Sequence, residues 1–166
     1  MDEIPLDLVL WVPCRIPPHK KLEAGASGED RYRLVQLATG SHPSFRISRV
    51  ELQRSGPSYT IDTVKFLQAG FPEPVARWYF LVGSDAARQL STWRQVGELK
   101  KRVTFIAIPR PGQKFWRPVK GVKTIRVKTL DISASDIRKR VKEGRSIRYL
   151  VPDPVRAYIL RKGLYR

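Results

Sequence analysis

The chain has 166 residues, of which 42% are hydrophobic and 10% aromatic, so it can bury a core and is not a disordered protein. Lys and Arg number 32 against 15 Asp and Glu, and the net charge of +17 favours anionic partners such as nucleotides, nucleic acid or a membrane surface. One cysteine and two histidines exclude a disulfide framework and a Cys/His zinc cluster. With no signal sequence and no apolar run near the roughly 18 residues of a membrane span, we expect a cytoplasmic protein.

Five segments are predicted to be strands. In chain order they are Leu6–Val12, Phe45–Leu52, Trp78–Val82, Val103–Ile108 and Val122–Leu130. The first, third and fourth are continuous apolar runs, typical of strands buried on both faces of a parallel sheet. The second and fifth alternate apolar with polar residues, and we expect them nearer a sheet edge.

Helical patterns lie between and after these strands, and most of them stop at a glycine. They are Glu29–Ala38, Thr60–Ala69, Asp85–Leu90, Ser133–Glu143 and a last helix from Asp153-Pro154 to Gly163. Because strands and helices alternate, the sequence predicts βα units and an α/β fold with a parallel sheet.

Polar residues follow every predicted strand. In open α/β sheets, ligands bind beyond the carboxyl ends of the strands, so these residues should share one rim. In chain order they are His19 and Lys20, then Ser58, Tyr59 and Thr60, then Ser84 and Asp85, then Arg110, then Ser133, Ser135, Asp136 and Arg138.

The rim residues after the fifth strand have the clearest mechanism. Ser133 and Asp136 have the spacing of a capping box, and a helix N-terminus with free N–H groups favours phosphate. Ser135 adds a hydroxyl and Arg138 adds a guanidinium fork. The alternative is a well-capped helix that binds nothing.

The other rim residues also have structural explanations. The turn before Thr60 can simply cap a helix, as can Asp85, although a carboxylate there also suits sugar hydroxyls. Trp93 is either a core residue or a stacking platform. Arg110 and the pair His19-Lys20 either face a phosphate or lie in solvated basic loops. Neither a G-x-G-x-x-G turn nor a P-loop is present, and two histidines leave no plausible Ser/His/Asp set.

Six segments together resemble bacterial nicotinate-nucleotide adenylyltransferases, a family of the nucleotidyltransferase α/β-phosphodiesterase superfamily. They are WVPCRIPPHK, ELQRSGPSYTIDTV, FLVGSDAARQLSTW, IPRPG, LDISASDIR and SIRYLVPDPVRAYI, spread from about Leu6 to Tyr165. The resemblance implies a Rossmann-like, doubly wound, mostly parallel sheet in three layers, in one nucleotidyltransferase domain over 1–166. It also implies that ATP and nicotinate mononucleotide give deamido-NAD and pyrophosphate, with Mg²⁺, in NAD biosynthesis.

The resemblance assigns roles to the rim residues. The expected acceptor-site residues are Tyr59 and Thr60, Asp85 on a ribose, Trp93 on the nicotinate ring and Arg110 on the phosphate. The expected ATP and phosphate residues are His19, Lys20, Ser133, Ser135 and Arg138. The family's I-S-S-T-x-I-R element has Ala134 and Ser135 here in place of its second serine and its threonine. Direct attack of one phosphate on another needs no covalent nucleophile, so positioning and charge neutralisation would dominate.

The sequence departs from the family at its start. The family begins with a strand and a G-G-x-F-x-P-x-H-x-G-H loop whose histidines contact the ATP phosphates, and this element is not in the sequence. His19 matches the later P-P-H-K element, so no catalytic residue is assigned. We expect the missing strand and loop to lie upstream of Met1, because MDEIPLDLVLWVP resembles the end of a helix running into the next strand.

Several alternatives remain open at this point. The chain could be a fragment, or a non-catalytic basic relative that binds nucleotide or RNA. An adenylyltransferase for nicotinamide mononucleotide or pantetheine phosphate is a further alternative.

Overall fold

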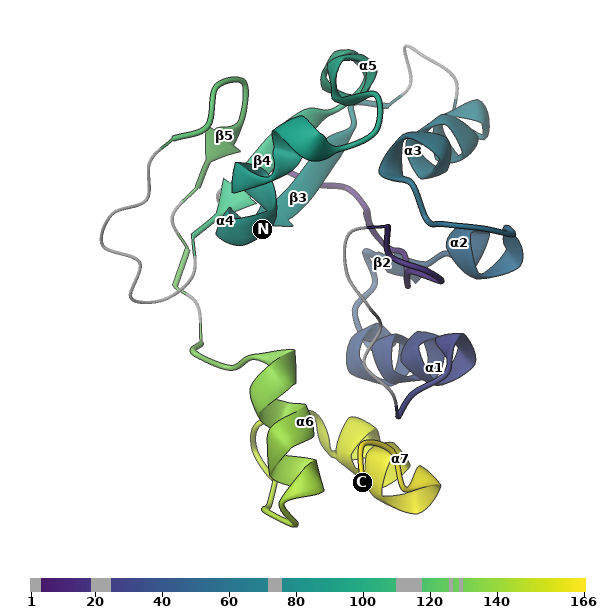
Figure 1. Ribbon diagram of the computed structural model, residues 1–166, viewed down its shortest axis with the longest axis vertical. Helices are drawn as coiled ribbons and strands as arrows, with labels where there is room; N and C mark the ends of the chain where they lie inside the picture. Colours follow the sequence, from purple (N-terminus) through teal and green to yellow (C-terminus); the bar gives the residue numbers. More distant parts are fainter. Residues whose placement is uncertain (1–3, 19–24, 72–75, 110–117, 126, 129) are drawn as a thin grey trace. The chain divides into compact units, whose positions relative to one another are not determined.

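The structure is a computed structural model that describes residues 4–18, 25–71, 76–109, 118–125, 127–128 and 130–166 (Figure 1). The chain forms two compact units. Unit 1 combines the described residues up to Ser58 with Ile132–Arg166, and unit 2 is Tyr59–Asp131. Each unit contains parallel strands and helices, which confirms the predicted α/β class.

Unit 2 is built on a three-stranded parallel sheet of order β3-β4-β5. Its strands are β3 (Tyr79–Gly83), β4 (Thr104–Ile108) and β5 (Lys123–Thr124). Its helices are α3 (Thr60–Ala69), α4 (Ser84–Arg88), the 3₁₀ turn η1 (Leu90–Thr92) and α5 (Val96–Arg102).

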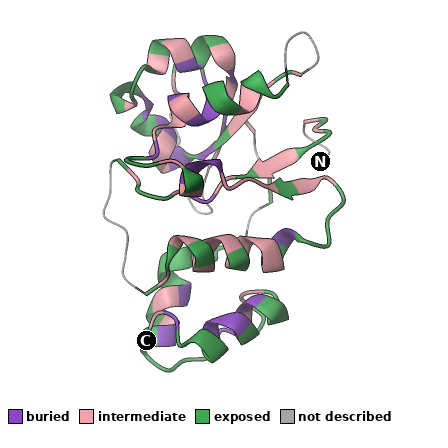
Figure 2. Cartoon of the chain, turned by 90° about the vertical axis from the view of Figure 1, so that its right-hand side faces the viewer, coloured by how far each residue is buried: buried purple, intermediate pink, exposed green. Residues whose placement is uncertain are grey.

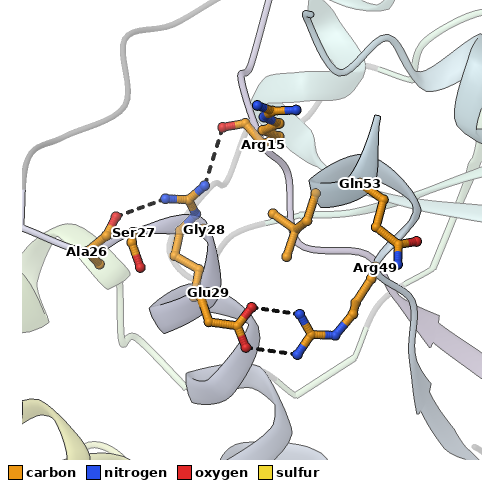
Figure 3. Close-up of a pocket in the computed structure, with 9 residues that line it drawn as sticks. Arg15, Ala26, Ser27, Gly28, Glu29, Arg49 and Gln53 are labelled. Atoms are coloured by element: carbon orange, nitrogen blue, oxygen red, sulfur yellow. Dashed lines mark hydrogen bonds and ion pairs between the residues drawn. The ribbon is translucent and has the colours of Figure 1, made fainter. Parts of the chain in front are cut away.

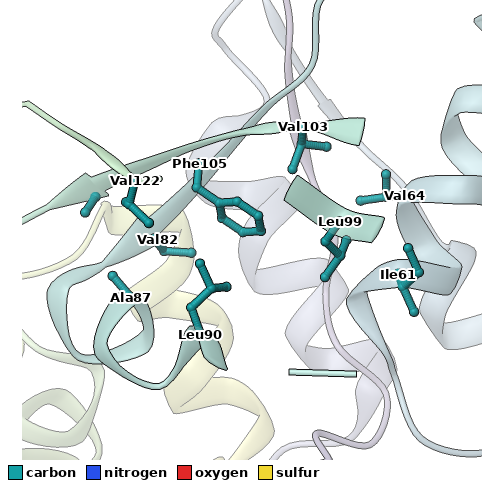
Figure 4. Close-up of a cluster of buried hydrophobic side chains, with 10 residues drawn as sticks. Ile61, Val64, Val82, Ala87, Leu90, Leu99, Val103, Phe105 and Val122 are labelled. Carbon is teal, nitrogen blue, oxygen red and sulfur yellow. The ribbon is translucent and has the colours of Figure 1, made fainter. Parts of the chain in front are cut away.

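The core of unit 2 lies between one face of this sheet and the helices (Figure 4). The register pairs Phe80 with Phe105 and Val82 with Ala107. Because side chains alternate along strands, these residues share a face. Leu90 and Leu99 pack against it and are almost completely buried, so η1 and α5 are held to the sheet by apolar contact.

Unit 1 contains a two-stranded parallel sheet and four helices. The strands are β1 (Val9–Trp11) and β2 (Phe45–Ile47), and the helices are α1 (Gly28–Thr39), α2 (Val50–Gln53), α6 (Ala134–Lys142) and α7 (Asp153–Lys162). The helix α6 buries Ile137 and Val141, and α7 buries Val155 and Ile159 (Figure 2). Residues four apart lie on one face of a helix, so these pairs form the apolar faces of a second core.

One polar contact joins α7 to α1. Ser27 and Asp30 form a reciprocal capping box at the start of α1. The Tyr158 hydroxyl donates to Asp30 Oδ1 at 2.9 Å. The Ser27 hydroxyl, and after it the Tyr158 hydroxyl, hold the pKa of Asp30 below its usual value, and the Asp30 carboxylate raises the pKa of Tyr158.

Most predicted elements are confirmed, but three strands are clearly shorter than expected. The first strand, predicted over Leu6–Val12, is paired only over Val9–Trp11. The strand predicted over Phe45–Leu52 is wrong after Ile47. Ser48 N–H still donates to Trp11 O, and the chain then turns into α2. Of Val122–Leu130, only Lys123–Thr124 is paired within the part that the structure describes. The last helix has Pro152 at its N-cap, so Asp153 is its first helical residue.

Candidate active site

The start of α6 is held by short-range hydrogen bonds. Ser133 is the N-cap, and its hydroxyl accepts from Asp136 N–H at 3.0 Å. The Asp136 carboxylate accepts from Arg140 Nε, also at 3.0 Å, so the side chain is engaged on the helix surface. Arg138 Nη2 donates to Ser135 Oγ at 3.0 Å. The α6 start therefore presents two exposed hydroxyls and a guanidinium beside a helix N-terminus.

A second group of predicted residues follows β3 in unit 2. Ser84 and Asp85 are the first two residues of α4. Asp85 Oδ1 accepts from Arg88 Nη2 at 2.7 Å, which orients this half-exposed carboxylate. Ser84 is completely buried, and its hydroxyl has no hydrogen-bond partner within the described residues. No feature of the sequence distinguishes a buried, unpaired Ser84 from an ordinary capping serine.

Trp93 lies directly after η1 and packs on the core of unit 2. Its ring meets Phe80 edge-on at 5.7 Å and Phe105 at 6.2 Å between centroids. The side chain is nevertheless only partly buried. Trp93 is therefore a core residue that keeps some surface for a ligand.

Tyr59 and Thr60 lie at the start of α3, where Thr60 is the first helical residue. Tyr59 packs against the same core as Trp93, and the guanidinium of Arg94 lies 4.5 Å from its ring centroid. Ser58 does not cap this helix, because its hydroxyl accepts from the backbone N–H groups of Arg15 and Ile16. The sequence analysis missed the contact between Arg94 and the Tyr59 ring. The only signal in the sequence was that Arg94 directly follows Trp93, a candidate site residue.

Three predicted residues, His19, Lys20 and Arg110, lie outside the described residues. Across 4–18, 25–71, 76–109, 118–125, 127–128 and 130–166, no cluster of three His, Cys, Asp or Glu could hold a metal ion. Among the described residues, no helix has the length and apolarity needed to cross a membrane.

A pocket of about 440 Å³ lies in unit 1 beside the start of α1 (Figure 3). Arg49 forms two hydrogen bonds to the Glu29 carboxylate, at 2.6 and 2.8 Å, and these lower the pKa of Glu29. Arg31 donates to the backbone oxygens of Ala26 and Cys14 at 2.9 and 2.7 Å. Arg49 is therefore neutralised by Glu29, whereas Arg31 keeps its charge while its guanidinium is held by backbone oxygens.

Comparison with known proteins identifies the family. A model of the cytidylyltransferase-like family matches residues 1–140. The "Probable nicotinate-nucleotide adenylyltransferase" of Geobacillus thermodenitrificans is 43% identical over 165 residues, which cover 99% of this chain and 75% of the relative. That of Thermus thermophilus is 42% identical over 161 residues, which cover 97% and 84%. The chain belongs to the cytidylyltransferase-like family and, within it, to the nicotinate-nucleotide adenylyltransferases. Nucleotidyltransferases of this family generally use a divalent metal ion with ATP.

Solved structures confirm the fold of these adenylyltransferases. The Plasmodium falciparum nicotinic acid mononucleotide adenylyltransferase complexed with NaAD aligns with a TM-score of 0.73 over 96% of this chain and 83% of its own. Sequence identity is 20%, so this likeness concerns the fold. It confirms the Rossmann-like α/β architecture that the sequence predicted. A non-catalytic RNA-binding relative is not favoured by any of these matches.

Proposed function

We propose that the chain transfers the adenylyl group of ATP to nicotinate mononucleotide, giving deamido-NAD and pyrophosphate in NAD biosynthesis. The observation that carries the proposal is 43% identity to a nicotinate-nucleotide adenylyltransferase over almost the whole chain. The net charge of +17 suits two polyanionic substrates. The lone cysteine agrees with a cytoplasmic location, which is part of the proposal.

The ATP phosphates are proposed to bind at the start of α6. Ser133 and Ser135 offer hydroxyls, and Arg138 offers a charged fork that is already oriented by Ser135 Oγ. A guanidinium oriented by a neighbouring hydroxyl needs little reorganisation to meet a phosphate oxygen. His19 and Lys20 complete the proposed phosphate path.

Nicotinate mononucleotide is proposed to bind the residues at the start of α3 and the residues that come after β3. Trp93 would stack on the nicotinate ring, and the Asp85 carboxyl group, oriented by Arg88, would accept hydrogen bonds from ribose hydroxyls. Tyr59 and Thr60 would line the same site, with Arg110 near the phosphate. The partly buried Trp93 supports this role, because a ring fixed by Phe80 and Phe105 loses little entropy when a ligand stacks on it.

The residues proposed to bind the two substrates are distributed over both units. The acceptor residues belong to unit 2, and Ser133, Ser135 and Arg138 belong to unit 1. The family match over residues 1–140 also crosses both units. We therefore propose one nucleotidyltransferase domain over 1–166, with ATP entering as its Mg²⁺ complex. Bound Mg²⁺ would offset charge on the phosphates.

The test is pyrophosphate release by protein expressed from the full reading frame. Release should require ATP and nicotinate mononucleotide together and should be absent with either alone. Nicotinamide mononucleotide and pantetheine phosphate should give lower kcat/KM than nicotinate mononucleotide. No release with any of the three acceptors, or a higher kcat/KM for one of the other two, would contradict the proposal.

A further inference from the structure

A second pocket, of about 390 Å³, lies in unit 2 where β3 and β4 begin. It is lined by residues 76–79 and 100–104, which lead into these two strands. Its volume is within the range of small-molecule sites. Asp85 comes after the opposite end of β3. The four steps from Tyr79 to Gly83, at about 3.3 Å per residue, separate the two ends of this strand by roughly 13 Å. This back-edge pocket is therefore separate from the candidate acceptor residues.

The charge of the back-edge pocket is of one sign. Its wall carries four cationic side chains and no carboxylate: Arg77, Lys100, Lys101 and Arg102. Arg102 Nε is paired with Glu98 at 2.8 Å, and Lys100 Nζ donates to Lys120 O at 3.1 Å. Arg77 and Lys101 form no hydrogen bond or ion pair with any residue that the structure describes. Two uncompensated cations at one pocket attract an anion.

The wall also contains an unused hydrogen-bond donor. The Trp78 indole N–H is buried and has no partner in the described ranges. Its ring is fixed edge-on against Phe71, at 5.9 Å between centroids. Trp78 is one of the residues that line the pocket, so its indole N–H resonance can report a ligand bound there.

The pocket beside α1 is the natural comparison. There Arg49 is neutralised by Glu29, whereas Arg77 and Lys101 have no such carboxylate. The end of α5 explains part of the cationic set, because lysine and arginine in a last helical turn interact well with the helix dipole. That explanation does not apply to Arg77, which lies ahead of β3 on another segment.

We propose that the back-edge pocket binds a phosphate-bearing anion, either inorganic or a phosphate ester, at a site distinct from the acceptor residues. The Arg77 guanidinium can meet two phosphate oxygens at once, and the Lys101 ammonium adds a point charge. None of these groups has a part in the adenylyl transfer proposed above, so either proposal can fail alone.

The experiment follows the indole N–H resonances of ¹⁵N-labelled protein. The chain has four tryptophans, and Trp78→Phe identifies the resonance of Trp78. Sodium phosphate, pyrophosphate and AMP are titrated separately, with sodium chloride holding the ionic strength constant. The Trp78 resonance should move and saturate with at least one phosphate compound, and the compound with the lowest saturating concentration distinguishes an inorganic ligand from an ester.

Two variants and a matched control decide the assignment. Arg77→Gln and Lys101→Gln should each weaken binding about tenfold, as expected for loss of a charge-assisted hydrogen bond. Lys123→Gln removes an exposed lysine of β5 that is outside the pocket and should leave the titration unchanged. The proposal is overturned if the Trp78 resonance does not saturate, if chloride moves it equally, or if the three variants behave alike.

Discussion

The two groups of candidate substrate residues are held in different ways. At the start of α6 in unit 1, the exposed Ser133 and Ser135 and the half-buried Arg138 are fixed by hydrogen bonds within one helical turn. In unit 2, Trp93 and Tyr59 are fixed by packing on a buried core. Substitution of Ser135 or Arg138 should therefore change binding with little effect on stability, whereas substitution of Trp93 or Tyr59 should change both.

The largest expected effect is on the core beneath Trp93. Phe105 is 1% exposed and contacts both Trp93 and Phe80. Phe105→Ala should lower the free energy of unfolding by about 3–5 kcal/mol, through lost burial and the cavity left behind. Urea denaturation measures the change. The control is Phe66→Ala, because Phe66 is 65% exposed; its effect should stay within about 0.5 kcal/mol. Equal effects would contradict the assigned core.

The next largest effect should be on ATP binding through Arg138. Arg138→Gln should raise the KM for ATP roughly 10- to 100-fold, the equivalent of about 1.5–3 kcal/mol for a charged hydrogen bond. Initial rates at saturating acceptor measure it. Arg140→Gln is the matched control, because Arg140 is paired with Asp136. Similar KM values for the two variants would contradict a specific contact between Arg138 and ATP, and would show that only the total positive charge of α6 affects ATP binding.

Trp93→Leu should affect both quantities at once. Loss of the edge contacts to Phe80 and Phe105 should lower the free energy of unfolding by about 0.5–1.5 kcal/mol. Loss of ring stacking should also raise the KM for nicotinate mononucleotide, with the KM for ATP unchanged. A fall in stability without any change in the acceptor KM would leave Trp93 as a core residue only.

The two serines at the start of α6 should separate capping from ligand binding. Ser133→Ala removes the N-cap bond and should cost about 1 kcal/mol of stability. Ser135→Ala, two residues further along, should change stability by less than about 0.5 kcal/mol and act mainly on the KM for ATP. Thermal unfolding and initial rates on both variants give the comparison, and the reverse pattern would refute it.

The smallest effect should be the acid dependence of unit 1. The folded-state pKa of Asp30 is lowered by Ser27 and then by Tyr158, so Asp30 stabilises the fold above its unfolded pKa of about 3.9. That contribution disappears as pH falls through the lower, folded-state pKa. Asp30→Asn should flatten the loss of stability between about pH 5 and pH 2, and Tyr158→Phe should do so in part. An unchanged slope in Asp30→Asn would contradict this linkage.

Local patterns were enough to predict much of the fold. The bounds of α3, Thr60–Ala69, match the prediction because the SGPSY turn and Gly70 mark both ends. The Ser133 cap was also predictable, since it depends on residues three apart. By contrast, α5 was missed, because its sequence VGELKKR has only two apolar residues and is held by the burial of Leu99.

The remaining site features depend on contacts between distant segments. The β1–β2 ladder has its last hydrogen bond from Ser48 N–H to Trp11 O, after which the chain turns into α2, and no local pattern encodes that end. The unpaired hydroxyl of Ser84 and the cation over Tyr59 likewise depend on tertiary packing. The back-edge pocket combines Arg77 with Lys101, 24 positions later in the chain, so composition showed the charge but not its location.

The bond between Tyr158 and Asp30 joins residues 128 positions apart, across the whole of unit 2. During synthesis, α1 leaves the ribosome first, but its partners α6 and α7 come only after residues 59–131. At about 5–20 residues per second, those 73 residues take roughly 4–15 seconds to make. Unit 2 is continuous and can fold as it emerges. The apolar side chains of Leu34 and Leu37 on α1 lack their packing partners on α6 and α7 for that time.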